Sequence, residues 1–243
     1  MTRTLPNLVI IGAMKCATTA LHHYLDQHPD IGMSNPKELN FFWGPASVNG
    51  DSPASTWHRG VEWYARQFQP TPIRGESSPG YTSPDHPEAA ARMAAVIPDT
   101  AVVYLVRDPV ERAVSQYWHH RADGDETRPM HAAILDPDSQ YISRGRYFER
   151  LMPYLEHFDP ARIAVVSQEQ LFSDHENVLR SLFRFLGVDP GRWTATASQE
   201  WNTSLRRTDA LTDSIRAELG ERFRDDTEKL RAFTGQVFPE WSV

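Results

Sequence analysis

The stretch that most constrains the fold of this chain is residues 9–21, with the sequence VIIGAMKCATTAL. Its first residues are continuously apolar, as is typical of a central parallel strand that is covered on both faces. Gly12 then begins a short turn, and Leu21, Tyr24 and Leu25 form the apolar stripe of a following helix. A turn at a helix N-terminus offers free backbone N–H groups to an anion. The stretch therefore predicts a strand, a phosphate-binding loop and a helix.

The turn departs from the G-x-x-x-x-G-K-[ST] pattern of loops that bind nucleoside triphosphates. Gly12 fits the first position and Thr19 the last, but Ala17 stands at the second glycine and Thr18 at the nucleotide-binding lysine. The only lysine of the loop, Lys15, lies inside the turn. Such a loop still binds phosphate through its backbone, but it is poorly suited to Mg-ATP. It indicates a phosphate-bearing donor other than a nucleoside triphosphate.

Strand-like and helix-like segments alternate along the chain. Apolar runs at residues 8–11, 101–106 and 163–166 predict strands, and residues 73–76 predict a shorter one. This alternation indicates an α/β fold with a central parallel β-sheet flanked by helices, in the three-layer arrangement of P-loop-like proteins. Because the length suits one domain and no boundary is evident, we expect residues 1–243 to form a single domain.

Capping signals mark the starts of two helices. Asp108 as N-cap and Pro109 as the first helical residue predict a helix directly after strand 101–106. Ser173 and Glu176 have the spacing of a capping box. A further helix near the C-terminus is predicted by apolar residues at helical spacing, namely Leu211, Ile215, Leu219 and Phe223.

Two segments lack a regular pattern. Residues 43–59 are rich in glycine, proline and serine, and residues 121–145 mix charges with turn-forming residues. Irregular loops of this length inside a compact domain are commonly lids or binding loops. We therefore expect these two segments to supply contacts to an acceptor substrate.

The charge balance excludes several classes of partner. A net charge of -7 and a pI of about 5.8 disfavour binding to nucleic acid or to an anionic membrane surface, so an anionic ligand needs a local basic pocket.

The single cysteine, Cys16, excludes an intramolecular disulfide and fits a reducing compartment. No segment approaches the roughly 20 apolar residues that span a bilayer, and the N-terminus does not read as a secretory signal. We expect a cytoplasmic protein.

Four pieces of sequence, read together, resemble a known enzyme family. They are the Gly12–Thr19 loop, PKELNFF at residues 36–42, RDPVERAVSQY at residues 107–117 and NTSLRR at residues 202–207. This set is similar to the sulfotransferases that use 3′-phosphoadenosine 5′-phosphosulfate (PAPS), nearest to the heparan sulfate branch and its bacterial relatives. The resemblance implies PAPS as co-substrate, PAP as second product and no metal.

The resemblance assigns the donor site to two motifs. In the first loop, Lys15 would contact the 5′-phosphosulfate. Donor contacts are also implied for the rest of the loop, Cys16, Ala17, Thr18 and Thr19. In the RDPVERAVSQY motif, Arg107 and Ser115 match the pair that binds the 3′-phosphate. A guanidinium suits forked phosphate contacts, and Ser115 lies about two helical turns further on. Arg112 of the same motif is expected on the helix surface or in a salt bridge.

The same resemblance implies two further catalytic residues. Glu38 matches the carboxylate that acts as general base in the heparan sulfate branch, and we expect the neighbouring Phe41 and Phe42 to desolvate it. The alternative is a solvated glutamate that pairs with Lys37. His119, one turn beyond the 3′-phosphate serine, matches a catalytic histidine of some relatives.

The resemblance is less definite in two other segments. Arg206 or Arg207 would close over the nucleotide, in a register that the sequence leaves open. Ser77 stands where relatives carry a lysine, which puts in doubt any electrostatic help from that segment.

These observations predict transfer of a sulfuryl group from PAPS to a hydroxyl or amine of a small-molecule or glycan acceptor. Two other classes stay open. One is a P-loop kinase or nucleotidase that uses Mg-ATP, against which Thr18 argues. The other is a PAP-binding protein without catalysis.

Overall fold

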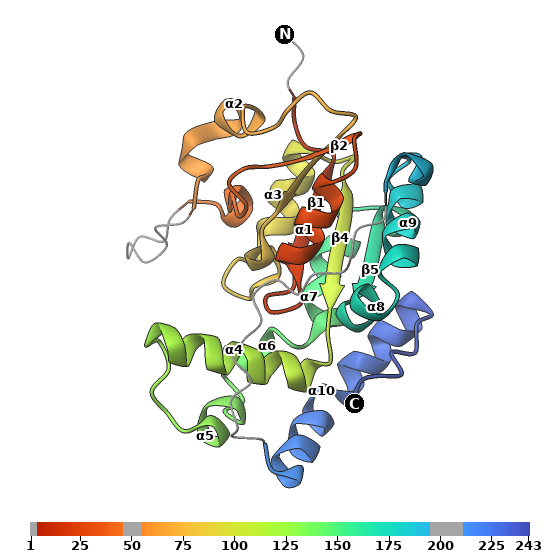
Figure 1. Cartoon of the computed structure of the whole chain (residues 1–243). Helices are drawn as coiled ribbons and strands as arrows, with labels where there is room; N and C mark the ends of the chain where they lie inside the picture. The colour runs from red at the N-terminus through yellow and green to blue at the C-terminus, as the bar shows by residue number, and fades with distance from the viewer. Residues whose placement is uncertain (1–3, 46–54, 195–210) are drawn as a thin grey trace.

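The protein is built around a five-stranded parallel sheet (Figure 1). The computed structural model describes residues 4–45, 55–194 and 211–243. The strands are β1 (Leu8–Gly12), β2 (Ile31–Met33), β3 (Ile73–Ser77), β4 (Ala101–Val106) and β5 (Ile163–Ser167), in the order β2-β3-β1-β4-β5. The predicted parallel α/β fold is confirmed. β2 is not visible in the sequence pattern, because three residues around a glycine carry too little periodicity to predict a strand.

Helices cover both faces of the sheet and make three layers (Figure 1). On one face, Tyr24 of α1 (Thr18–Asp26) packs against His175 of α9 (His175–Phe185), with ring centroids 4.3 Å apart. On the other face lie α3 (Ala89–Val96) and α7 (Tyr147–Leu155), where Tyr147 packs against Tyr104 of β4. Because both faces are covered, the central strand β1 is completely buried, which explains its continuous apolar run.

A second group of helices lies across the carboxyl ends of the strands (Figure 1). Its main member is α4 (Pro109–Asp123), accompanied by α5 (Met130–Ile134), α6 (Gln140–Ser143) and α10 (Asp213–Thr234). The predicted cap of α4 is confirmed, since the Asp108 carboxylate accepts the N–H groups of Val110 and Glu111. This cap fixes where α4 starts and therefore where Arg107 leaves the sheet.

Three sequence-based predictions about these helices are wrong in detail. Ser173 does not cap a helix but ends α8 (Gln168–Ser173), whose own cap is Ser167; α9 follows after Asp174 without a capping side chain. Leu211 precedes α10, which begins after its cap Thr212. Residues 121–145 are not one irregular loop, because α5 and α6 lie within them.

Arg112 was expected on the helix surface or in a salt bridge and is instead completely buried. Its guanidinium donates to the side chain of Gln116 and to the backbone carbonyl of Tyr141, so it ties α4 to α6. Among the described residues no carboxylate forms an ion pair with it. Two neutral oxygens thus hold a buried cation, which sequence spacing alone does not reveal.

The remaining elements are α2 (Gly60–Ala65) and short 3₁₀ turns; α2 is joined to β3 by the hydrogen bond from Tyr64 to Glu76. None of the helices described, over residues 4–45, 55–194 and 211–243, is long and apolar enough to cross a membrane.

Candidate donor and catalytic site

The loop between β1 and α1 is shaped by backbone hydrogen bonds and two left-handed residues. The N–H of Ala13 donates to the carbonyl of Leu105 in β4 (2.7 Å). Lys15 and Ala17 have φ angles of 70° and 63°, and Ala17 precedes α1 without a side-chain cap. The first N–H groups of α1 are therefore not taken by a capping side chain. An uncapped helix N-terminus at the end of a parallel strand is a typical anion site.

Cys16 contributes its backbone to this loop rather than its thiol. The side chain is completely buried, with Sγ 3.6 Å from the hydroxyl of Tyr147. Burial raises the pKa of the thiol to about 11, so the group stays protonated at neutral pH. Thr18 is buried and Thr19 half-buried in the first turn of α1, next in sequence to this backbone.

Lys15 and Arg107 lie near each other although 92 positions separate them in sequence. Lys15 is half-buried, and its pKa is lowered first by that burial and then by the charge of Arg107. The charge of Asp123 at the far end of α4 acts in the opposite direction. The neighbouring strands β1 and β4 thus bring two cations together beside the N-terminus of α1. Such an arrangement favours a multiply charged anion.

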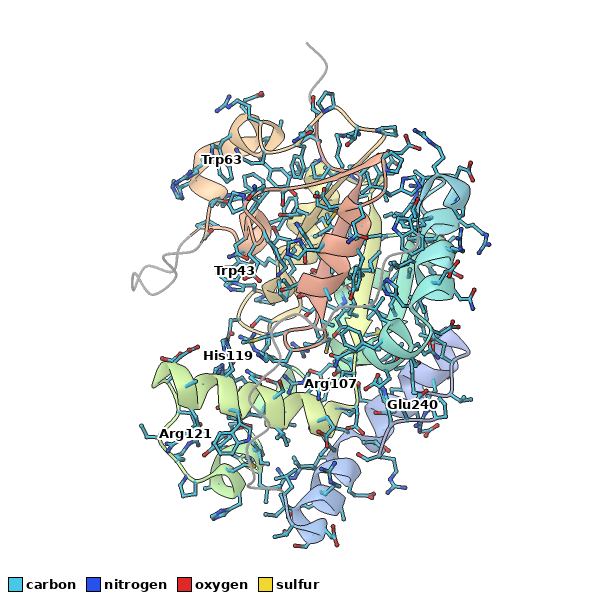
Figure 2. All side chains as sticks on the ribbon, viewed as in Figure 1. Trp43, Trp63, Arg107, His119, Arg121 and Glu240 are labelled. Atoms are coloured by element: carbon cyan, nitrogen blue, oxygen red, sulfur yellow. The ribbon has the colours of Figure 1, made fainter. Side chains whose placement is uncertain are left out.

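Ser115 and His119 both lie on α4, which carries them past the carboxyl ends of the strands. Ser115 is buried, whereas His119 is exposed and its Nδ1 lies 3.5 Å from the carboxylate of Asp123. Figure 2 shows His119 on the side of α4 that faces the sheet and Arg121 on the opposite side. His119 therefore projects toward the same end of the sheet as the phosphate loop.

Glu38 is held at the carboxyl end of β3, one strand away from the loop. Its N–H donates to the carbonyl of Ser77 (3.1 Å), and its left-handed φ of 64° turns the chain there. The carboxylate is half exposed and pairs with Lys37 at 2.5 Å. Phe41 and Phe42, expected to desolvate it, are instead buried in the core. The structure thus shows the alternative arrangement, a solvent-exposed glutamate paired with Lys37, at the end of the sheet where the loop also lies.

Glu76 is a buried carboxylate that the sequence analysis did not single out. It lies on β3, completely buried, and its Oε1 accepts the hydroxyl groups of Tyr64 (2.8 Å) and Tyr81 (2.7 Å). Burial raises its pKa to about 7, although both hydroxyl groups favour the ionised form. The Tyr81 oxygen also accepts the N–H of Phe42 (3.3 Å), which links Glu76 to the segment that carries Glu38. The only signal available in the sequence was a carboxylate inside the short strand predicted at residues 73–76.

Tyr147 is a second residue that sequence reasoning missed. Its hydroxyl accepts the N–H of Arg107 (3.3 Å) and contacts Sγ of Cys16. The loop after β1 and the turn after β4 therefore both contact one buried tyrosine. Arg206 and Arg207 lie outside the described residues. Within residues 4–45, 55–194 and 211–243, no group of three or more histidine, cysteine or acidic side chains is arranged to hold a metal ion.

The fold and this loop define the class of protein: a P-loop-like α/β protein with an uncapped helix N-terminus after its central strand. The family description "Sulfotransferase domain" matches residues 5–224, and the chain belongs to that family of PAPS-dependent sulfotransferases. A sulfotransferase structure from Alicyclobacillus acidocaldarius has a TM-score of 0.79 and 26% identity, covering 98% of this chain and 99% of that one. A mouse sulfotransferase complexed with PAP shares the fold, with a TM-score of 0.50, 15% identity and coverage of 92% and 65%.

Curated relatives come from the heparan sulfate branch. Heparan sulfate glucosamine 3-O-sulfotransferase 3B1 of Mus musculus is 32% identical over 76% of this chain and 47% of its own length. The bifunctional heparan sulfate N-deacetylase/N-sulfotransferase 1 of Caenorhabditis elegans is 28% identical over 97% of this chain and 28% of its own length. The chain thus spans less than half the length of these two relatives.

Proposed function

We propose that this protein transfers the sulfuryl group of PAPS to a hydroxyl or amine of an acceptor and releases PAP. The observation that carries the proposal is the placement of Lys15 and Arg107 directly after the neighbouring strands β1 and β4, next to the uncapped N-terminus of α1. Two neighbouring positive charges repel each other, and a bound anion with several charges relieves that repulsion. PAPS has such charges at both ends of its ribose. Membership of the sulfotransferase family supports the same donor.

In the proposed reaction, the acceptor oxygen or nitrogen attacks sulfur while the bond from sulfur to the 5′-phosphate oxygen breaks. The bonding pair stays on that phosphate, and the acceptor proton passes to the carboxylate of Glu38. Lys15 stabilises the charge that grows on the leaving phosphate, with help from His119. Arg107 and Ser115 bind the 3′-phosphate and set the position of the donor.

The rest of the donor site is proposed from the same loop. The backbone of Cys16 and Ala17 and the first turn of α1, with Thr18 and Thr19, would hold the 5′-phosphosulfate. A closing role for Arg206 or Arg207 stays a prediction. Three further statements also stay predictions: a single domain over residues 1–243, a reaction without metal and a cytoplasmic location.

The acceptor class is proposed from the relatives. Two of them are named for heparan sulfate, one for O-sulfation of glucosamine and one for N-sulfation. We therefore propose a glycan or a small molecule with a hydroxyl or amine as acceptor. The Mg-ATP kinase alternative is not favoured, because the family description covers the phosphate loop itself. A PAP-binding protein without catalysis is the remaining alternative, and it predicts PAP binding with no turnover of PAPS.

The first test is calorimetric titration with PAP in the absence of magnesium, with Mg-ATP as the control. PAPS turnover is then followed as PAP release, with a glucosamine-containing oligosaccharide and a simple phenol as acceptors. Tight PAP binding and turnover would support the proposal. Binding of Mg-ATP but not of PAP would overturn it.

Variants separate the proposed roles. Glu38→Gln should leave the PAP affinity unchanged and lower turnover by about 10²- to 10⁴-fold, the usual contribution of a general base. Glu156→Gln, on an exposed carboxylate at the end of α7, is the matched control. Arg107→Ala should weaken PAP binding by about tenfold or more, because it removes a charge-assisted phosphate contact. Full turnover by Glu38→Gln would remove Glu38 from the mechanism.

A further inference from the structure

The chain after α10 folds back onto the turn that carries Arg107. Residues 236–243, called the return segment here, contain two buried aromatic rings, Phe238 and Trp241, which stack at 4.2 Å. Figure 2 shows Glu240 of this segment near the end of α4 where Arg107 is labelled. The family description ends at residue 224, so the return segment lies beyond the part of the chain that it matches.

The first contact of the return segment is with the cap of α4. Asp108 is 4% exposed, and its Oδ1 accepts the N–H groups of Val110 and Glu111. Its Oδ2 accepts the backbone N–H of Ser242 at 2.5 Å. One oxygen of this buried carboxylate is therefore occupied by α4 and the other by the return segment. A buried carboxylate needs such donors to remain ionised at low cost.

The second contact reaches the backbone of the turn itself. The indole N–H of Trp241 donates to Oε2 of Glu169 (3.2 Å), and Oε1 of Glu169 accepts the N–H of Asp108 (3.0 Å). The Trp241 ring also packs against Tyr147, with ring centroids 5.8 Å apart. Tyr147 in turn accepts the N–H of Arg107. The backbone N–H groups of Arg107 and Asp108 thus donate to Tyr147 and Glu169, the two side chains that Trp241 contacts.

The segment is itself fixed to the rest of the molecule. The guanidinium of Arg231 in α10 donates to the carbonyls of Val237 and Val243, at 3.0 and 2.6 Å. The side-chain amide of Gln236 donates to the carbonyl of Val165 in β5 (3.1 Å). The return segment is therefore anchored at both ends, and it can hold the turn in one conformation.

We infer that the return segment positions Arg107 for the 3′-phosphate of the donor, with Ser242 and Trp241 as positioning residues. A turn held by hydrogen bonds before binding loses less conformational entropy when its guanidinium engages phosphate. This inference rests on the proposed function, because it assumes that Arg107 binds the donor. It predicts that weakening the segment lowers PAP affinity only through Arg107.

A backbone substitution tests the inference. Ser242→Pro removes the N–H that Asp108 accepts, whereas Ser242→Ala keeps it and changes only an exposed side chain. PAP affinity is measured by calorimetry for both variants, each with Arg107 and with Arg107→Ala. With Arg107 present, Ser242→Pro should weaken PAP binding about tenfold, equal to ~1.4 kcal/mol, and Ser242→Ala less than twofold. With Arg107→Ala, the additional effect of Ser242→Pro should fall below twofold.

Two results would overturn the inference. The first is equal PAP affinity for the proline and alanine variants. The second is an equal loss with and without Arg107, which would show a general loss of structure. Failure of the unsubstituted protein to bind PAP would instead overturn the proposed function. If Ser242→Pro does not fold, Trp241→Phe keeps an aromatic ring beside Phe238 and removes the donor to Glu169 together with part of the indole packing. Trp241→Phe should weaken PAP binding about threefold when Arg107 is present, and this effect should disappear with Arg107→Ala.

Discussion

Replacing Glu76 by glutamine should change how the stability of the protein depends on pH. Glu76 is completely buried on β3, and its Oε1 accepts hydroxyl groups from Tyr64 and Tyr81. Glutamine has nearly the same shape and keeps a carbonyl oxygen for these two donors. It cannot ionise, however, so the substitution removes only the titration of this site and adds a cost that is independent of pH.

The size of the effect follows from the pKa of Glu76, which burial raises from 4.5 to about 7. A folded-state pKa above the unfolded one means that the native protein binds the proton more tightly. Between these two pH values the unfolded chain has lost the proton and the native protein has not, so stability falls as pH rises. At 1.36 kcal/mol per pKa unit, the titration of Glu76 alone removes ~3 kcal/mol of stability over this range. The Glu76→Gln variant does not lose it.

The assay is urea unfolding of both proteins at about pH 5 and about pH 8, with the free energy of unfolding extrapolated to water. As pH rises from about 5 to about 8, the free energy of unfolding of Glu76→Gln should increase by ~3 kcal/mol relative to that of the unsubstituted protein. Effects common to both proteins cancel in this difference. Glu156→Gln, on the surface, is the control and should show a change below ~0.5 kcal/mol. An equally small change for Glu76→Gln would refute the reasoning.

Three further predictions concern residues around the loop. Because burial raises the pKa of Cys16 to about 11, its thiol should not react with an aromatic disulfide reagent in the native protein and should react once urea unfolds it; rapid native reaction would contradict this. A Cβ on Gly12 would lie 2.3 Å from Oγ1 of Thr82, so Gly12→Ala should cost ~1–3 kcal/mol in urea unfolding, and Thr82→Ala should restore part of it. Burial lowers the pKa of His22 to about 4, so its titration should remove ~3 kcal/mol of stability as pH falls from 6.5 to 4, and His22→Asn should gain that amount relative to the unsubstituted protein over the same interval; equal pH profiles of the two proteins would count against this.

The sequence determined the elements whose signals are local. Continuous apolar runs identified three of the five strands, β1, β4 and β5, because a strand covered on both faces admits few polar side chains. Asp108 and Pro109 identified the start of α4, because an N-cap acts within one helical turn. The loop after Gly12 and the turn at Arg107 were also located, since parallel strands place their ligand sites at their carboxyl ends.

Only the tertiary structure decided which charges are buried and what they contact. Arg112 was expected on the helix surface or in a salt bridge, yet packing of α6 against α4 encloses it. The sequence shows that Glu76 lies within a strand, but only the packing of Tyr64 and Tyr81 against that strand supplies the hydroxyl groups that donate to its carboxylate. The contact of Ser242 with Asp108 joins residues 134 positions apart. Burial and long-range contacts depend on how distant segments pack, and no local pattern of residues records that.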